Sequence, residues 1–412
     1  MSEERDLSVL IVPRTGGVVA CGDLWEPVRI VDAAGDPVTA VATFLKDLQA
    51  SGRSESTQRS YAMDLLRWFR FLWAIEVPWD QATRTEARDF CRWLAFADKA
   101  PRGPAAGPSV SNVPNPVTGK YRPGRTYAAT TRAHSETVLR VFYDFHRDVG
   151  TGPMVNPFPL SRDRRGGRAN AHHNPMEPYR NDRVGLYRPR VAQRIPRCIP
   201  DALFNQVFAE LGSHRDRALV ALWVSTGARA SELLGARCSD VDPGQQLVTV
   251  VRKGSRSLQQ LPASPDAFVW LRLYQSEIDQ EISTGPDDPL WWTRRRPFRP
   301  LSYHAARAMF ARAAAALGAD WTLHDLRHTA AYRMARDPAL PLADVQWVLG
   351  HAHLSTTQLY LTPMPGDVIA GVLAHHRRRQ PLAAPDLPGR TPDVPSSYRP
   401  ESLDVLFGGQ NS

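Results

Sequence analysis

The sequence predicts a mainly α-helical protein, with an all-α N-terminal domain and a C-terminal α+β domain that contains one small β-hairpin sheet. Three observations predict this fold. Between residues 37 and 150, apolar side chains recur at helical spacing in four stretches. Residues 151–197 lack apolar periodicity and are rich in Pro, Gly and Arg, which is typical of a linker. Residues 198–379 return to helical patterns, interrupted once by two strand-like runs, 246–252 and 257–261.

The charge of the chain favours a polyanionic partner. Among 412 residues, 51 Lys and Arg outweigh 42 Asp and Glu, which gives a net charge of +9. Nearly all of the positive charge is arginine, whose planar guanidinium suits phosphate. Lysine occurs only at Lys46, Lys99, Lys120 and Lys253, so each lysine is informative.

Cysteine usage and the lack of long apolar runs predict a cytoplasmic protein. The four cysteines lie far apart and form no CxxC pair, so neither a disulfide framework nor a zinc site is expected. The first residues are acidic and do not resemble a signal peptide. Because no run of about 18 apolar residues exists, we expect no membrane partner.

The N-terminal domain, residues 37–150, is predicted to follow a short arm, residues 1–36. The arm has one apolar run at 9–12, which indicates a short strand or an extended segment. The first helix begins near residue 38, and Ser56 or Thr57 is expected to cap the second. The third and fourth helices are expected at about 84–97 and 128–148, on either side of a loop at 100–125. The predicted inward faces are Val41, Phe44, Leu45 and Leu48; Tyr61, Leu65, Trp68, Phe69 and Leu72; Ala87, Phe90, Cys91 and Leu94; and Val138, Leu139, Val141, Phe142 and Phe145.

The second domain, residues 198–379, is predicted to place its hairpin turn at 253–256, between the two strands. Pro-rich residues 380–412 are expected to form a disordered tail. Helices are expected at about 201–211, 215–226, 263–282, 302–317, 325–336, 342–350, 355–361 and 366–377.

Five side chains of the second domain together suit chemistry on a phosphodiester. Arg229 lies in the segment TGARASELLGAR, His324 and Arg327 lie in LHDLRHTAAYRMA, and His351 and Tyr360 lie in LGHAHLSTTQLYL. Two fixed cations can hold a doubly charged transition state while a phenol oxygen attacks phosphorus.

Each of these residues is ambiguous when it is taken alone. His324 and Arg327 share a helix face, but such pairs arise by chance and a histidine is often a satisfied core residue. Arg229 has a structural interpretation as an ion pair with Glu232, although a carboxylate can also support a catalytic arginine. Tyr360 alone fits any half-buried tyrosine. The joint pattern is much less probable by chance.

In order and spacing, these motifs resemble the tyrosine recombinase (phage integrase) family. The resemblance covers the arginine box, the His-x-x-Arg box, the Leu-Gly-His box and a tyrosine nine residues after that histidine. It implies that residues 198–379 form a catalytic domain. It also implies that residues 37–150 form a helical, SAM-like core DNA-binding domain, with double-stranded DNA as the partner.

The resemblance implies a role for each motif residue. Arg229 and Arg327 would bind the scissile phosphate, and Tyr360 would attack it to form a 3′-phosphotyrosine. His324 would be the base or hydrogen-bond partner of Tyr360, and His351 a second donor to the phosphate. The bond energy would be kept in the ester, so neither ATP nor a metal or other cofactor is expected.

A proton donor is also needed for the leaving 5′ oxygen. Arginine cannot supply this proton near neutral pH, whereas lysine can. In the family a hairpin lysine does so, which implies this role for Lys253; the alternative is a solvated turn lysine. His328 and His353 flank the motifs and are expected to be structural.

Contacts to DNA and to other subunits are predicted in general terms only. The candidate DNA-binding residues are Arg59, Arg67 and Arg70 on one helix and Arg132 and Arg140 on another, with ordinary solvated faces as the alternative. Two interpretations are open for the arginines of the linker: they lie along the phosphate backbone of DNA, or they are merely solvated. These residues are Arg162, Arg164, Arg165 and Arg168. By resemblance, the apolar stripe of helix 366–377 would dock on a neighbour in a homotetramer on two DNA sites; alternatively it folds back on its own domain.

Three functions are compatible with this pattern. The first is a nucleoid-associated site-specific recombinase or integrase that integrates, excises or transposes a mobile element. The second is a type IB topoisomerase, which the separate helical domain and the C-terminal apolar stripe disfavour. The third is a DNA-binding regulator on an inactive scaffold, which the full reactive set disfavours.

Overall fold

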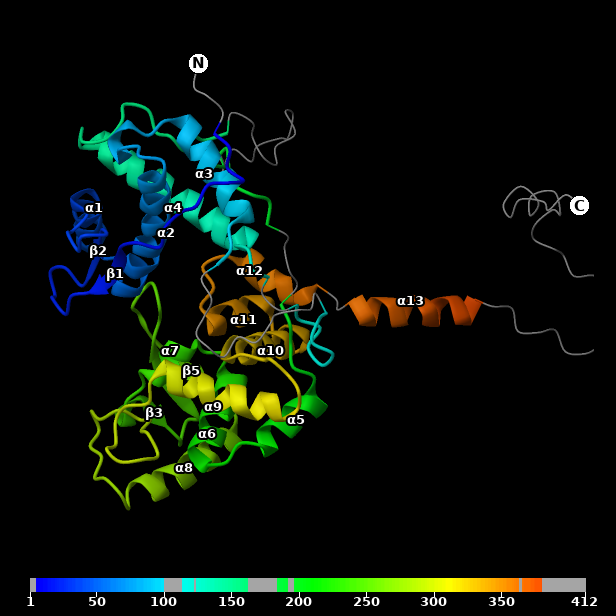
Figure 1. Cartoon of the computed structure of the whole chain (residues 1–412). Helices are drawn as coiled ribbons and strands as arrows, with labels where there is room; N and C mark the ends of the chain where they lie inside the picture. Colours follow the sequence, from blue (N-terminus) through cyan, green and yellow to red (C-terminus); the bar gives the residue numbers. More distant parts are fainter. Residues whose placement is uncertain are drawn as a thin grey trace, which may run out of the picture. The chain divides into compact units, whose positions relative to one another are not determined.

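A computed structural model describes most of the chain as two compact units, shown in Figure 1. The described residues are 5–99, 113–121, 124–161, 184–191, 196–362 and 365–379. The fold class is as predicted: mainly helical, with two small antiparallel sheets. The linker arginines Arg162, Arg164, Arg165 and Arg168 and the tail 380–412 lie outside the described residues.

The division into units departs from the predicted boundary near residue 198. The second unit contains Gly212–Ala305 and the described residues from Leu323 onward, but Asn205–Leu211 and Ala306–Thr322 group with the first unit. The segment Ala306–Thr322 is attached to the first unit by a hydrogen bond, which the side chain of Asn115 donates to the carbonyl oxygen of Gly318 at 2.8 Å.

The first unit begins with a β-hairpin that was not predicted. Strand β1 (Gly17–Ala20) pairs antiparallel with β2 (Val28–Val31), and Val28 and Ile30 of β2 are fully buried in the core of the unit. The apolar run at 9–12 is not a strand but the extended segment that was the alternative. Its side chains point alternately to solvent and to the core: Val9 and Ile11 are exposed, whereas Leu10 and Val12 pack against the core.

Four helices complete this unit, as predicted. They are α1 (Thr39–Ala50), α2 (Glu55–Ala74), α3 (Arg84–Phe96) and α4 (Ala129–Asp148). The cap of α2 is Ser54 rather than Ser56 or Thr57, because the Ser54 hydroxyl accepts the Thr57 N–H. Val141, which was expected to face inward, is exposed.

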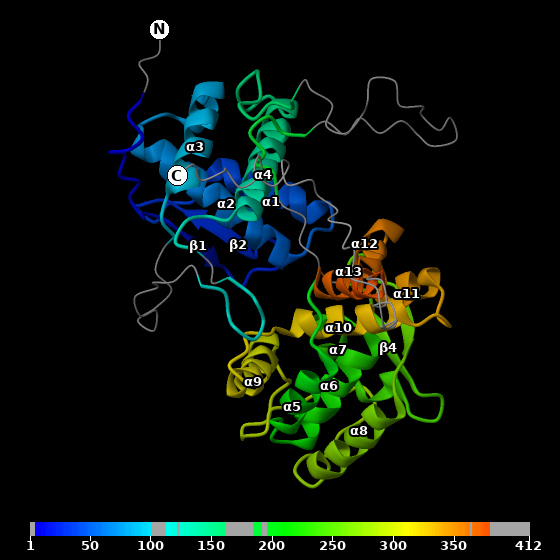
Figure 2. The same ribbon diagram turned by 90° about the vertical axis from the view of Figure 1, so that its right-hand side faces the viewer.

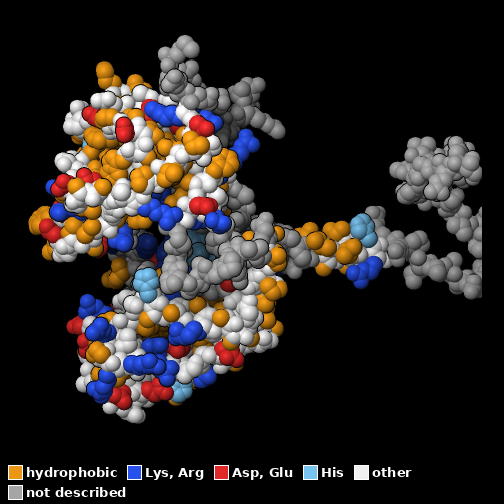
Figure 3. Space-filling view, in the orientation of Figure 1, with side chains coloured by type: hydrophobic (Ala, Val, Ile, Leu, Met, Phe, Trp, Pro, Cys, Tyr) orange, Lys and Arg blue, Asp and Glu red, His pale blue; other side chains and the backbone are white. Residues whose placement is uncertain are grey.

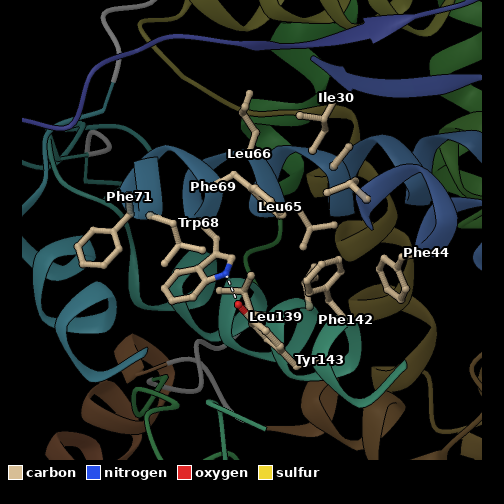
Figure 4. Close-up of a cluster of buried hydrophobic side chains, with 14 of the residues drawn as sticks. Ile30, Phe44, Leu65, Leu66, Trp68, Phe69, Phe71, Leu139, Phe142 and Tyr143 are labelled. Carbon is tan, nitrogen blue, oxygen red and sulfur yellow. Dashed lines mark hydrogen bonds between the residues drawn. The ribbon is translucent and has the colours of Figure 1, made fainter. Parts of the chain in front are cut away.

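Aromatic side chains form the centre of this core, and Figure 4 shows them between α2 and α4. The Trp68 indole N–H donates to the Tyr143 hydroxyl at 2.9 Å, and this hydroxyl donates to the carbonyl of Trp79. Phe90 and Phe158 pack edge-on against Trp68. The buried polar atoms of Trp68 and Tyr143 are thus satisfied, which lets α2 and α4 pack without a desolvation penalty.

In the second unit, α6 packs against α8 and α10, and a three-stranded antiparallel sheet, β3-β4-β5, supplies the predicted hairpin. The short helix α7 and strand β3 were not predicted. After α4, the elements up to α8 in chain order are α5 (Asp201–Ala209), which is divided between the two units, α6 (His214–Thr226), α7 (Ala230–Leu234), β3 (Val241–Asp242), β4 (Leu247–Val251), β5 (Leu258–Pro262) and α8 (Pro265–Ile278).

The remaining helices are α9 (Tyr303–Ala316), most of which groups with the first unit, α10 (Leu323–Arg336), α11 (Leu342–Leu349), α12 (Leu354–Gln358) and α13 (Pro365–Arg379). A short 3₁₀ turn, η3 (Leu359–Leu361), follows α12 and carries Tyr360. Helices α10, α11 and α12 lie side by side in both Figure 1 and Figure 2. Within the described ranges, no helix has the length and apolarity needed to cross a membrane.

Candidate active site

The segment after α6 holds Arg229 in a fixed position. Helix α6 ends at Thr226 and is capped by Gly227, whose left-handed φ of +62° suits glycine and turns the chain into α7. A side chain at Gly227 would also meet Leu349 at 2.8 Å. Arg229 precedes α7, and its guanidinium forms the predicted ion pair with Glu232, with Nη1 and Oε1 2.9 Å apart.

Glu232 binds several neighbours at once. Its carboxylate accepts the backbone N–H of Arg229 at 2.8 Å, Nη1 of Arg252 at 3.0 Å and the backbone N–H of Lys253 at 3.1 Å. Burial alone would raise the pKa of this carboxyl, but these hydrogen bonds and the charge of Arg252 outweigh burial and lower the pKa. Glu232 therefore stays ionised and attaches the hairpin to the arginine box.

Arg252 is a site residue that the sequence interpretation missed. It is 4% exposed and donates to Glu232 and to Gln259 Oε1, the latter at 2.6 Å, and also to the carbonyl of Val348. The signal for it was present in the alternation of β4. Val248 and Val250 face the core, so the next residue in this period-two pattern is Arg252.

Lys253 follows Arg252 at the start of the predicted turn, and its side chain is exposed. Its backbone is held by Glu232, and the turn is closed by a hydrogen bond from the Arg252 N–H to the Ser257 carbonyl at 2.9 Å. Glu232 thus fixes the backbone of Lys253, whereas the side chain of Lys253 is exposed to solvent.

Arg327 is the most deeply placed cation among the predicted site residues. It is 4% exposed and donates to the carbonyls of Gly227 at 2.6 Å and Leu349 at 2.7 Å, which lie at the C-terminal ends of α6 and α11. Such ends carry partial negative charge and favour a cation. Burial and the charge of Arg229 lower the pKa of Arg327 to about 10, so the guanidinium is charged at neutral pH.

The hydrogen bonds of His351 define its protonation state. Nε2 lies 3.0 Å from Nη2 of Arg327, and Nδ1 lies 3.0 Å from the hydroxyl of the buried Thr357. Because arginine only donates, Nε2 must be the acceptor and Nδ1 carries the proton. Burial and the charges of Arg327 and Arg229 lower the pKa of His351 to about 4, in agreement with a neutral ring.

Tyr360 is brought to the same place by η3. It is 5% exposed and packs with Ala331, Val345 and Leu349. Its hydroxyl lies 2.8 Å from Nδ1 of His328, and its ring stacks over that of His351. Burial raises the pKa of the phenol, against the lowering effect of the charge of Arg327.

His324 and His328 lie one helical turn apart on α10, with ring centroids separated by 4.2 Å. His324 lies at the exposed edge of the cluster, and partial burial and Arg327 lower its pKa. The sequence assigned contact with Tyr360 to His324 and a structural role to His328. The hydrogen bond to the phenol is instead made by His328.

The site has an excess of positive charge. Glu232 forms ion pairs with Arg229 and Arg252 and acts electrostatically on Arg327, and these four side chains together carry a net charge of +2. Such a site favours a phosphate and favours a doubly charged transition state even more. Within the described ranges, no three His, Cys, Asp or Glu side chains gather in the manner of a metal site.

The arginines proposed for DNA in the first unit differ in their availability. Arg67 is engaged with Asp64 and Ser135, and Arg140 lies 3.5 Å from the carboxylate of Glu136. Arg70 donates to the backbone carbonyls of residues 14–16. Arg132 is partly buried, and Arg59 is the exposed member of the set.

Comparison with known proteins agrees with this arrangement. Residues 201–365 match the model of the phage integrase family, and residues 41–102 match that of the phage integrase N-terminal SAM-like domain. Tyrosine recombinase XerC of Chromobacterium violaceum is 32% identical over 209 residues, which cover 48% of this chain and 67% of XerC. Tyrosine recombinase XerD of Neisseria meningitidis serogroup B is 28% identical over 199 residues, or 46% of this chain and 66% of XerD.

The chain belongs to the tyrosine recombinase (phage integrase) family. Its match spans less than two thirds of several of these relatives, for example 59% of XerD from Pseudomonas aeruginosa. Solved structures share the fold at low sequence identity. The Tn1549 transposon integrase in complex with circular intermediate DNA has a TM-score of 0.52 and 14% identity, over 81% of this chain and 98% of that one. A lambda integrase dimer bound to a core site has a TM-score of 0.51 and 16% identity, over 78% and 76%.

Proposed function

We propose that this protein is a site-specific DNA recombinase that cuts and rejoins strands through a 3′-phosphotyrosine on Tyr360. The observation that carries the proposal is the convergence of Arg229, Arg327 and Tyr360 around a site with a local charge of +2. Family membership supports the same chemistry.

The arginines and the tyrosine divide the work. Arg229 and Arg327 bind the non-bridging oxygens of the scissile phosphate and stabilise the pentavalent transition state. Because Arg252 is buried and paired with Glu232, it adds positive charge to the site without contacting the phosphate directly. His351 donates to the phosphate only after Nε2 is released from Arg327 and has gained a proton, since that nitrogen is an unprotonated acceptor in the free protein.

Lys253 protonates the leaving 5′ oxygen. Its backbone is fixed to Glu232 while its side chain is exposed, which suits a group that reaches to bound DNA. With cations supplied by arginine and the bond energy kept in the phosphotyrosine, the reaction proceeds without ATP and without a metal.

The partner is double-stranded DNA. Four copies of the chain bind two DNA sites as a homotetramer. Helix α13 supports the tetramer, since its apolar side chains Val368, Ile369, Val372 and Leu373 are 44–60% exposed. Figure 3 shows hydrophobic side chains along this helix. An apolar stripe of this kind needs a partner surface. The strand transfer would integrate, excise or transpose a mobile element, and the DNA that flanks the gene would identify it by its attachment sites.

The test begins by selecting a binding sequence from randomised duplexes. A nick in the selected duplex then traps the covalent intermediate, because the short strand diffuses away after cleavage. The wild-type chain should form an adduct that survives denaturant, and Tyr360→Phe should bind the duplex without forming one. DNA binding without any adduct would favour a non-catalytic regulator. Relaxation of supercoils without strand exchange would favour a topoisomerase.

A further inference from the structure

His328 hydrogen-bonds to the hydroxyl of Tyr360, a contact that the sequence motifs assigned to His324. Its Nδ1 lies 2.8 Å from the hydroxyl of Tyr360, and the two ring centroids are 5.7 Å apart. Both side chains are largely enclosed, and Tyr360 is only 5% exposed. A hydrogen bond to the reacting oxygen is the geometry that proton transfer requires.

We propose that His328 is a catalytic residue, which accepts the phenolic proton of Tyr360 at Nδ1 as the oxygen attacks the scissile phosphorus. This inference rests on the proposed strand-transfer function. The O–H bond of Tyr360 breaks and an N–H bond forms on His328. The electron pair left on the phenolic oxygen forms the new O–P bond. The bond from phosphorus to the 5′ oxygen breaks with its pair, and that oxygen takes its proton from Lys253. In rejoining, His328 returns its proton to Tyr360.

The surroundings of His328 keep its ring able to accept a proton. Burial, followed by the neighbouring His324, lowers the pKa of His328 to about 4, so the ring is neutral at pH 7. Burial raises the pKa of Tyr360, so very little of the phenol ionises unaided at pH 7. The negative charge on the non-bridging oxygens of the transition state then favours the imidazolium during the reaction. The charged or titratable groups around His328 are His324, Asp325 and Arg327 on α10, Tyr360 on η3, and His351 before α12.

The alternative is that His328 only holds the phenol in place. His328→Asn separates these roles, because an amide oxygen near the position of Nδ1 can accept the hydrogen bond but cannot keep the proton. We expect this variant to bind the selected duplex as the wild type does and to cleave it about 10²- to 10⁴-fold more slowly at pH 7. Its cleavage rate should rise by about tenfold per pH unit, because unaided ionisation of the phenol becomes limiting.

A second measurement tests the proton directly. Incorporating a difluorotyrosine at position 360 makes the phenol more acidic, so it should restore most of the rate lost in His328→Asn. It should not restore a variant that lacks Arg229. In the unmutated chain, the cleavage rate should change less than about threefold between pH 6 and 8, which tests the proposal even if the variant does not fold.

The exposed histidine His353 supplies the control, and His353→Ala should cleave at the wild-type rate. The inference is overturned if His328→Asn cleaves like the wild type, or if its loss is independent of pH and unaffected by difluorotyrosine. A tenfold rise per pH unit in the unmutated chain would overturn it as well. Absence of any adduct in the wild type would instead defeat the proposed function, so the two failures are distinguishable.

Discussion

Glu232 and Arg252 form an ion pair that is closed to water. Oε2 and Nη1 are 3.0 Å apart, and the two side chains are 1% and 4% exposed. The pair joins the arginine box of α7 to the end of β4, while the backbone of Lys253 hydrogen-bonds to the other oxygen of the same carboxylate. One carboxylate thus holds Arg229, the proposed phosphate-binding residue, and the backbone of Lys253, the proposed general acid.

The first prediction concerns Arg252. Arg252→Leu should lower the free energy of unfolding by about 3 kcal/mol, because removing one partner of a buried pair leaves the other charge poorly compensated. Arg237→Leu is the matched control, since Arg237 and Asp287 are 58% and 92% exposed, and it should cost less than about 0.5 kcal/mol. Urea denaturation measures both, and equal losses would contradict the buried role of Arg252.

The second prediction concerns the pH dependence of Glu232. Because its pKa is lowered in the folded chain, the stabilisation is complete above the unfolded-state pKa of about 4.3 and is lost as pH falls through the lower folded value. Compared with Glu232→Gln, the wild type should therefore be clearly more stable at pH 7, with a gap that narrows below about pH 4. Denaturation curves from pH 7 to 3 measure the difference in free energy of unfolding between the two proteins. A difference that stays constant over this range would show that ionised Glu232 does not stabilise the fold.

The third prediction concerns Arg229. Arg229→Lys keeps the charge but loses the planar fork that binds two phosphate oxygens. The cleavage rate of a nicked duplex should fall by about 10²- to 10³-fold, while gel-shift affinity changes little. Arg237→Lys is again the control and should cleave normally. A much weaker affinity with an unchanged cleavage rate would assign Arg229 to ground-state binding instead.

The fourth prediction separates two arginines of α2. Arg59 is exposed, so Arg59→Ala should weaken DNA binding and reduce the slope of log affinity against log salt by about one. Arg70 donates to backbone carbonyls of the N-terminal segment, so Arg70→Ala should mainly lower thermal stability. Salt titrations and melting curves of both variants test the difference. Identical behaviour would refute it.

The helices and the motif residues were predictable because their signals are local. Apolar spacing along α2 and α4 requires no knowledge of the rest of the chain, and Arg229 and Glu232 are close enough in sequence to pair within one turn. The hairpin β1–β2 was missed because its four-residue strands are too short to show alternation. Helix α7, with five residues, is likewise too short for helical periodicity.

The two missed site residues depend on tertiary contacts. Arg252 is recognisable as a site residue only when the core face of β4 is continued past the end of the apolar run. His324 and His328 lie on the same helix, and sequence spacing does not say which of them Tyr360 meets. That choice depends on how α11, α12 and η3 return the chain to α10.

In the proposed reaction, Tyr360 becomes esterified to DNA. The most direct measurement is mass spectrometry of the nuclease-trimmed and protease-digested complex formed on a nicked duplex, in the presence of EDTA and the absence of ATP. We expect one nucleotide-bearing peptide, with its 3′-phosphate on Tyr360. Cleavage that requires added magnesium and leaves no peptide on the DNA ends would contradict it.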